Sequence, residues 1–282
     1  MIIIDGKKAA ATLREELKKK ISELKSTYNA VPGLTVILVG EDPPSKIYVR
    51  NKEKFANEIG IKSEVVRYPD TIEEKTILNK IEELNKNSNV SGILVQLPLP
   101  IHIDKRKIIE AILPDKDVDG LHPMNVGNLS SGYDSMVPCT PLGCYLLIKD
   151  IEKDLNGKHA VVIGRSNLNG KPMTQLLLKE NCTVTITHSK TKDLKAECKR
   201  ADIIVAAVGR PKLVKADWVK KDAIVIDVGI NKTDTGLVGD VDFEEVSKVA
   251  KAVTPVPGGV GPMTIACLLS NTVECFKKVR SN

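Results

Sequence analysis

Hydrophobic positions along the chain form two alternating patterns: short continuous apolar runs, and longer segments in which apolar residues recur every three or four positions. The first pattern is typical of buried strands and the second of amphipathic helices. In the first half they predict, in order, a strand at 34–39, a helix at 45–59, a strand at 62–67, a helix at 72–84 and a strand at 92–96. Such alternation indicates parallel sheets covered by helices, so the sequence predicts the α/β fold class.

The second half repeats the alternation around a glycine-rich turn. A buried strand at 159–163 leads into the turn 164–172 (GRSNLNGKP), and a helix is predicted at 173–180. Further strands are predicted at 183–187, 203–208 and 223–228. A strand, a glycine-rich turn, a helix and a second strand form the βαβ pattern of a Rossmann-like dinucleotide-binding domain.

A chain of 282 residues exceeds the usual size of one domain, roughly 100–200 residues, so two domains are expected. Residues 1–120 are predicted to form the first and 139–267 the second. The stretch 114–141 between them is rich in glycine and proline, shows little periodicity and is predicted to be a linking loop. A last apolar helix should begin after Pro262, and its end, about 268–282, is expected to pack back on the first domain.

Composition and charge narrow the classes of function. The six cysteines form no CxxC pair and no metal-ligand spacing with the four histidines, so no metal site is predicted and buried reduced thiols are expected. No apolar run has the length of a signal peptide core or a membrane span, which favours a soluble, cytoplasmic protein without a membrane partner. The net charge is +6, but aromatic residues are only 3%, which argues against nucleic acid and for small polyanionic ligands.

Candidate chemistry appears first on the predicted helix 45–59. Tyr48 and Lys52 are four positions apart, so their side chains share one helical face. Gln96 ends the predicted strand 92–96, because the prolines that follow cannot continue a central ladder. Ligands of open parallel sheets bind beyond the carboxyl ends of the strands, so all three side chains are expected at one site. A Tyr-x3-Lys pair alone is more often two amphipathic surface residues, and only the motifs that follow favour the site.

Two loops have both a structural and a functional interpretation. The segment 114–123 (PDKDVDGLHP) has three acids in five residues, which serve either turn geometry or a ligand. The segment 257–262 (PGGVGP) either allows close backbone approach to a ligand or forms a rigid interdomain loop. Sequence physics alone leaves both open.

The turn 164–172 lacks a full GxGxxG motif, and a plain strand-to-helix turn is the alternative to a phosphate site at a helix N-terminus. Domains selective for NAD usually place an acid about 20 residues further on, at the end of the second strand. Here that position holds His188, Ser189 and Lys190, and Arg165 lies in the turn. The sequence therefore predicts NADP as the cofactor.

Five segments in this order resemble the bifunctional methylenetetrahydrofolate dehydrogenase/methenyltetrahydrofolate cyclohydrolase family, over essentially the whole chain. They are 45–52 (SKIYVRNK), 95–100 (VQLPLP), 115–120 (DKDVDG), 164–167 (GRSN) and 255–264 (PVPGGVGPMT). The resemblance implies oxidation of 5,10-methylenetetrahydrofolate by NADP and hydrolysis of the product to 10-formyltetrahydrofolate, in one-carbon metabolism and purine biosynthesis. It also implies two α/β domains with the active-site cleft between them, and a homodimer formed through the nucleotide-binding domains.

The resemblance also implies roles for single residues. Lys52 is the key catalytic residue, with Tyr48 and Gln96 as its catalytic neighbours and Asp119 as the anchor of the pterin ring. The remaining positions fall into two groups, substrate-binding and cofactor-binding: Leu97, Pro257, Gly258 and Gly259 for the folate, and Gly164, Arg165, Ser166, Ser189 and Ile230 for NADP.

Three other functions fit parts of the pattern. A short-chain dehydrogenase also uses Tyr-x3-Lys, but its glycine turn precedes that motif, and here the order is reversed. A shikimate-type dehydrogenase shares the domain order and a catalytic lysine, but it requires neither Gln96 at a strand end nor the loop 257–262. A nucleotide-binding sensor without catalysis would not need Lys52, Gln96 and Asp119 together.

Overall fold

The computed structural model describes residues 1–234 and 236–281, which divide into two compact units. Unit 1 comprises Met1–Ala11, Leu129–Tyr133 and Pro138–Cys267, and unit 2 comprises Thr12–Asn128, Asp134–Val137 and the chain from Leu268 onward. The sequence placed residues 1–120 together, whereas Met1–Ala11 cluster with unit 1. The reason is that strand β1 (Ile2–Ile3) pairs with a strand of that unit's sheet.

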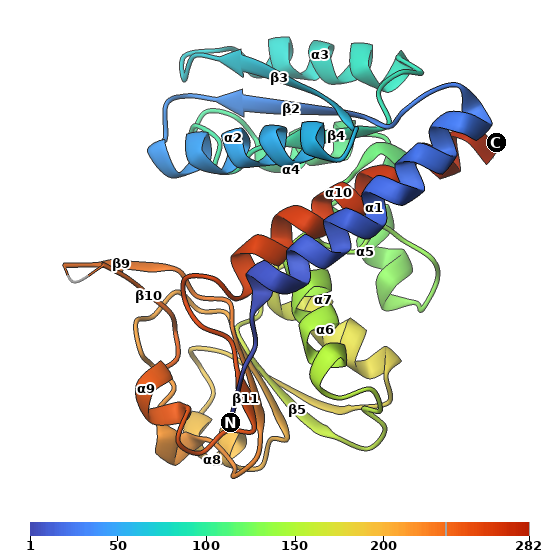
Figure 1. Cartoon of the computed structure of the whole chain (residues 1–282). Helices are drawn as coiled ribbons and strands as arrows, with labels where there is room; N and C mark the ends of the chain where they lie inside the picture. The colour runs from blue at the N-terminus through green and yellow to red at the C-terminus, as the bar shows by residue number, and fades with distance from the viewer. Residues whose placement is uncertain (235, 282) are drawn as a thin grey trace. The chain divides into compact units, whose positions relative to one another are not determined.

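Unit 2 is built on a parallel sheet with the strand order β3-β2-β4. Every residue of β2 is buried, because helices cover both faces of the sheet, and Figure 1 shows α2 and α3 on opposite sides of the strands. Isoleucine and valine side chains from β2, β4, α3 and α4 form the core on one face. The elements of the unit are β2 (Gly33–Val39), α2 (Pro43–Glu58), β3 (Lys62–Tyr68), α3 (Glu74–Lys86), β4 (Gly92–Val95), α4 (Lys105–Ala111), η1 (Pro114–Lys116) and most of α1 (Gly6–Tyr28).

Helix α2 begins where the sequence predicted a helix start. The Asp42 carboxylate accepts hydrogen bonds from Ser45 N at 3.0 Å and Ser45 Oγ at 2.6 Å, and prolines occupy the first turn. The helix stops before Gly60, whose φ of +91° suits a residue without a Cβ. This cap and stop fix the register of the face that carries Tyr48 and Lys52.

The stretch 114–141, predicted as a linking loop, contains helical segments, so the prediction of a loop was wrong for those parts. It contains η1, α5 (Pro123–Ser130) and the start of α6 (Cys139–Ile151). Helix α5 has no strong apolar face, and its start is held by a buried carboxylate: Asp117 Oδ2 accepts from His122 N at 2.7 Å and from Asn125 Nδ2 at 2.9 Å. Hydrophobic periodicity could not reveal a helix that polar contacts hold in place.

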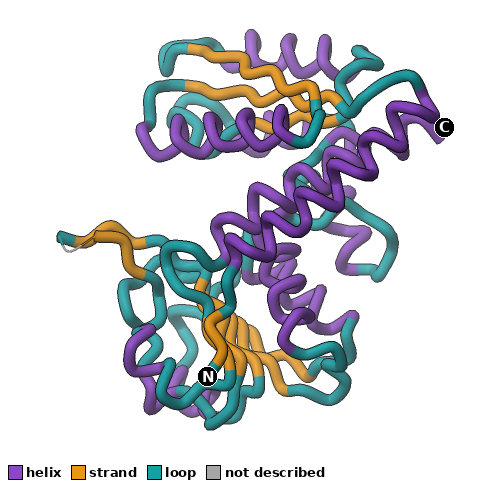
Figure 2. The backbone as a smooth tube through the Cα atoms, viewed as in Figure 1, coloured by secondary structure: helices purple, strands orange, loops and turns teal. Residues whose placement is uncertain are grey.

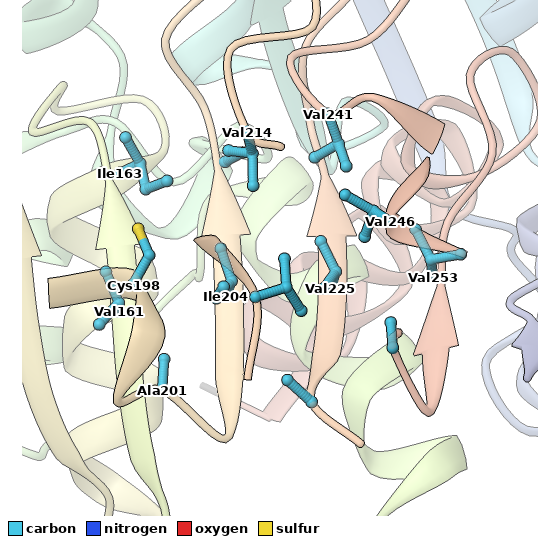
Figure 3. Packing of buried hydrophobic residues seen from close by; sticks show 14 residues of the cluster. Val161, Ile163, Cys198, Ala201, Ile204, Val214, Val225, Val241, Val246 and Val253 are labelled. Atoms are coloured by element: carbon cyan, nitrogen blue, oxygen red, sulfur yellow. The ribbon is translucent and has the colours of Figure 1, made fainter. Parts of the chain in front are cut away.

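Unit 1 is built on a parallel sheet with the order β6-β5-β7-β8-β11-β1. Figure 3 shows how Val161, Ile204, Val225 and Val253, from four neighbouring strands, lie on one face of this sheet and pack in a common core. Its elements are β5 (His159–Ile163), α7 (Gly170–Lys179), β6 (Thr183–Thr187), α8 (Leu194–Lys199), β7 (Ile203–Ala206), η2 (Ala216–Trp218), β8 (Ile224–Asp227), α9 (Phe243–Val246), β11 (Ala252–Val253) and the first part of α10 (Val260–Ser281).

Strand β5 is followed along the chain by β6 on one side and, later, by β7 on the other. The sheet therefore has its topological switch point between β5 and β7, where dinucleotides bind in such folds. Strands β7 and β8 end earlier than the predicted 203–208 and 223–228, because the chain turns there into loops that buried carboxylates hold. Figure 2 shows the antiparallel hairpin of β9 (Asn231–Thr233) and β10 (Gly236–Val238) standing away from the parallel sheet.

All six cysteines are buried and free, as predicted. Among the described residues, no helix combines the length and the apolar character needed to cross a membrane. Within that same part of the chain, no cluster of His, Cys, Asp and Glu side chains is arranged to hold a metal ion.

Candidate active site

The predicted pair of Lys52 and Gln96 meets in unit 2. Lys52, on α2, is buried with 8% of its surface exposed, and its Nζ donates to Gln96 Oε1 at 2.9 Å. Gln96 follows β4, and its backbone N–H extends the ladder by donating to Ile37 O at 2.9 Å. Tyr48 lies one turn before Lys52 and is half-buried, and this burial raises the pKa of its phenol. A buried amine held beside a strand end is suited to proton transfer with a bound substrate.

The side-chain amide of Gln96 has a fixed orientation. Its Oε1 accepts from Lys52, while its Nε2 donates to Leu97 O at 2.7 Å. Turning the amide over would place two donors against each other and two acceptors against each other. The peptide bond between Leu97 and Pro98 is cis. Gln96 thus presents an acceptor to the amine of Lys52.

The acidic loop separates into structural and candidate functional residues. Lys116 is buried, and its Nζ donates to Leu84 O, Asn85 O and Asn87 O at 2.8–2.9 Å, which satisfies the carbonyls at the end of α3. Burial lowers the pKa of Lys116. Asp117 holds the start of α5, as described above, whereas Asp119 is only half-buried. Of these two acids, Asp119 is therefore the more accessible.

The backbone beside Asp119 is held from helix α10. Asn271 is buried, and its Nδ2 donates to Val118 O and to Val137 O at 2.9 Å each. Asp117 forms a parallel bridge with Ile93, so the chain then runs along β4 toward its carboxyl end. Local sequence patterns did not reveal Asn271 as a functional residue, because its partners lie more than 130 positions away.

The glycine turn of unit 1 fits a phosphate group. Gly164 has a φ of +118°, and a Cβ there would lie 2.4 Å from Ala207 O. A Cβ on Gly170 would lie 2.0 Å from Gly164 O, so both positions require glycine. Ser166 Oγ accepts from Asn169 N at 3.1 Å and shapes the turn before α7. The N–H groups at the start of a helix attract anions, so the start of α7 is a candidate site for a phosphate group.

The residues predicted to select NADP lie on neighbouring loops. Gly164 N donates to Thr187 O at 2.9 Å, which brings the turn that carries Arg165 next to the loop that carries Ser189. Both side chains are exposed. Ile230, in the loop after β8, is 51% exposed. An exposed cation and a hydroxyl, without a carboxylate in 188–190, fit a cofactor that carries a 2′-phosphate.

Two buried carboxylates that the sequence analysis missed lie under these loops. Asp227 is 3% exposed and Asp240 is 0% exposed. Burial, and to a smaller extent the charge of Asp240, raises the pKa of Asp227, hydrogen bonds from backbone N–H groups lower it, and the net result is a pKa of about 7. The glycines beside them were a usable signal, because a Cβ on Gly229 or Gly239 would collide with the carboxylates.

The loop of Pro257, Gly258 and Gly259 belongs to unit 1. It joins β11 to α10 and packs against the start of α1, where Lys7 N donates to Gly258 O at 3.2 Å. A Cβ on Gly6 would lie 1.7 Å from Gly259 O, so the two segments touch through their backbones. The structure thus brings Lys52 and Gln96 into direct contact, places Tyr48 and Asp119 in the same unit, and places the cofactor residues and this loop in unit 1.

Comparison with known proteins gives the family. The sequence profile of the tetrahydrofolate dehydrogenase/cyclohydrolase catalytic domain matches residues 4–119, and that of the tetrahydrofolate dehydrogenase/cyclohydrolase NAD(P)-binding domain matches residues 138–280. The chain belongs to this family. The resemblance found in the sequence is therefore confirmed, and so is the α/β class with a parallel-sheet nucleotide-binding domain.

Individual relatives match the chain over almost its full length. The bifunctional protein FolD of Pelagibacter ubique is 78% identical over 278 residues, which are 99% of each chain. The crystal structure of the bifunctional FolD methylenetetrahydrofolate dehydrogenase/cyclohydrolase of Campylobacter jejuni is 51% identical, with a TM-score of 0.96 over 99% of each chain. The Trypanosoma brucei dehydrogenase-cyclohydrolase, solved with NADP and an inhibitor, is 38% identical, with a TM-score of 0.95 over 100% of this chain and 99% of that one.

Shikimate dehydrogenase, the type of enzyme considered as an alternative, shares only the fold. The enzyme of Aquifex aeolicus is 15% identical over 89% of this chain and 93% of its own, with a TM-score of 0.54.

Proposed function

We propose that this protein oxidises 5,10-methylenetetrahydrofolate to 5,10-methenyltetrahydrofolate with NADP and hydrolyses that product to 10-formyltetrahydrofolate. The observation that carries the proposal is the partly buried hydrogen bond from Lys52 Nζ to Gln96 Oε1, in a unit that matches the family's catalytic domain. The high sequence identity to bifunctional relatives, over almost the full length of the chain, supports both activities. One-carbon metabolism is the setting, and purine biosynthesis is a consumer of the formyl product.

The dehydrogenase step asks the protein for orientation. A hydride leaves the bridging carbon readily, because the lone pair of a neighbouring nitrogen stabilises the cation that forms. NADP, when bound, supplies the hydride acceptor. No side chain has to remove a proton in this step, so Lys52 acts here only through contact with the folate.

The cyclohydrolase step asks for proton transfer. Water adds to the methenyl carbon and loses a proton, which leaves a hydroxyl group there. The ring carbon–nitrogen bond then breaks as that nitrogen gains a proton, and the hydroxyl loses its proton to become the formyl carbonyl. The amine of Lys52 is the group proposed to move these protons. Gln96 Oε1 accepts a hydrogen bond from Lys52 Nζ and so keeps the amine in place. Tyr48, on the same face of α2, is proposed to contact the substrate beside it.

The remaining residues bind rather than react. The carboxylate of Asp119 is proposed to accept hydrogen bonds from the adjacent N–H donors of the aminopyrimidinone edge, as a carboxylate pairs with a guanidinium. Leu97 and the loop of Pro257, Gly258 and Gly259 are proposed to line the folate. Gly164, Arg165, Ser166, Ser189 and Ile230 are proposed to contact NADP. Residues 1–120 with the end of α10 would then serve folate chemistry, and 139–267, apart from the loop 257–259, the cofactor.

The assembly and location follow the family resemblance. We propose a homodimer formed through the nucleotide-binding domains, in the cytoplasm. Light scattering of the purified protein should give about twice the 30.8 kDa mass of one chain. A mass equal to one chain at working concentrations would contradict the dimer and would leave the activity proposal untouched.

The experiment that tests the function supplies methylenetetrahydrofolate and NADP together and follows NADPH absorbance and the methenyl chromophore. NADPH should form, and the methenyl species should appear and then decay. Binding of NADP without NADPH formation would identify a nucleotide sensor instead, and NADPH formation only with shikimate would identify the other dehydrogenase class.

A further inference from the structure

The buried acids Asp227 and Asp240 are joined to the loops at the carboxyl ends of β7 and β8. Asp240 Oδ2 accepts from Val208 N at 2.7 Å and Gly209 N at 3.0 Å, and its Oδ1 accepts from Arg210 N at 2.8 Å. These N–H groups belong to the loop after β7, which borders the switch point between β5 and β7. The same loop begins at Ala207, whose carbonyl packs against Gly164 of the phosphate turn.

The loop after β8 is held from both sides of Ile230. Before it, Gly229 N donates to Asp227 Oδ1 at 3.0 Å. After it, Asn231 Nδ2 donates to Asp240 Oδ1 at 2.9 Å, at the base of the β9–β10 hairpin that Figure 1 shows. Ile230 itself is exposed. The one side chain of this loop proposed to touch the cofactor is therefore carried between two anchored residues.

The two acids are also tied to each other. Asp227 Oδ1 accepts from Asp240 N at 2.9 Å, and Asp227 Oδ2 accepts from Val241 N at 2.9 Å. A Cβ on Gly239 would lie 1.8 Å from Asp227 Oδ2, and one on Gly229 would lie 2.2 Å from Asp240 Oδ1. Burying two carboxylates is costly unless hydrogen bonds satisfy them, and here backbone N–H groups of the loops after β7 and β8 and of the segment 240–241 do so.

We propose that Asp240, supported by Asp227, is a positioning residue of the dehydrogenase reaction that preorganises the loops after β7 and β8 for NADP. The inference rests on the proposed function, because it assumes that NADP binds at this edge of the sheet. Without the carboxylate, NADP would have to order the loops as it binds. The apparent affinity for NADP is then the intrinsic affinity multiplied by the fraction of molecules whose loops are already ordered. Hydrolysis of methenyltetrahydrofolate consumes no NADP, so the cyclohydrolase activity provides an internal control.

The test is Asp240→Asn, which keeps the shape of the side chain and replaces one accepting oxygen by a donor. Charge-assisted hydrogen bonds are lost, so the KM for NADP should rise by about tenfold or more, while kcat at saturating NADP and the cyclohydrolase rate without NADP stay within about twofold. The matched control is Asp242→Asn. Asp242 is a neighbouring acid whose Oδ2 accepts from Lys215 Nζ at 2.9 Å, and it should leave both measurements unchanged.

A second variant guards against failure to fold. Asn231→Ala removes one hydrogen bond to Asp240 and leaves the carboxylate in place, so the KM for NADP should rise by about two- to fivefold with cyclohydrolase unchanged. If Asp240→Asn is insoluble, the KM for NADP of Asn231→Ala decides whether the inference holds. An unchanged KM for NADP, or an equal loss of both activities, overturns the inference. If the wild-type protein forms no NADPH at all, the proposed function fails instead.

Discussion

The two units use different groups for their proposed chemistry: side chains in unit 2 and the backbone in unit 1. In unit 2 the reactive groups are side chains that touch each other, Lys52 Nζ and Gln96 Oε1. In unit 1 the groups proposed to bind phosphate are backbone N–H groups at the start of α7, in a turn that Gly164 and Gly170 allow to pack closely. We therefore expect unit 2 to lose its activity when a side chain is removed, and unit 1 to lose cofactor binding when a single methyl group is added.

The largest effect is expected from Lys52→Met, which keeps most of the stem and removes the amine. Hydrolysis of the methenyl substrate should fall by at least the roughly 10²–10⁴-fold typical of losing a general acid or base, while hydride transfer falls much less. Gln96→Ala should also reduce hydrolysis disproportionately, because it releases Lys52 Nζ. Decay of the methenyl chromophore and NADPH formation measure the two steps. An equal loss of both in Lys52→Met would make the lysine a substrate-positioning group.

Asp119→Ala should weaken both activities together, by about tenfold or more in kcat/KM, because it removes a charged anchor that both folate substrates share. Steady-state kinetics with each substrate measures the effect. The control is Asp115→Ala, an exposed acid of the same loop, which should change neither activity. Loss confined to the cyclohydrolase would mean that Asp119 transfers protons.

Gly164→Ala tests the backbone site of unit 1. The new Cβ would lie 2.4 Å from Ala207 O, so the turn must shift, and the KM for NADP should rise by about tenfold. Gly157→Ala is the matched control: its φ of +70° is also positive, but nothing lies within 4 Å of the added Cβ. An equal rise in the KM for NADP in both variants would mean that the strain of a positive φ, and not the close approach to Ala207 O, sets the requirement for glycine.

The smallest effect concerns the choice between cofactors. The wild-type protein should prefer NADP over NAD by at least about tenfold, the size of one contact difference of about 1.4 kcal/mol. Arg165→Ala should erode this preference while turnover with NAD persists. The measurement is kcat/KM with each cofactor, and equal use of both by the wild type would contradict the role of Arg165.

The sequence predicted those features that local spacing encodes. The placement of Tyr48 and Lys52 on one helix follows from helical spacing, that of Gln96 from a strand end, and the tight turn before α7 from its glycines. It could not predict contacts between distant segments: Asn271 reaches Val118 across 153 positions, and Lys116 reaches the end of α3 across about 30. Polar contacts also produced helix α5 inside a predicted loop. The place of β1 in the sheet of unit 1 was also not predicted, because strand pairing there depends on a partner about 250 positions away.

The most direct test of the account compares Lys52→Met with Gly164→Ala in the same two assays. The account predicts a crossed result: Lys52→Met loses hydrolysis and keeps the wild-type KM for NADP, whereas Gly164→Ala keeps hydrolysis without NADP and loses affinity for NADP. If either variant reduces hydrolysis and NADP affinity by the same factor, the two units do not divide the chemistry as proposed.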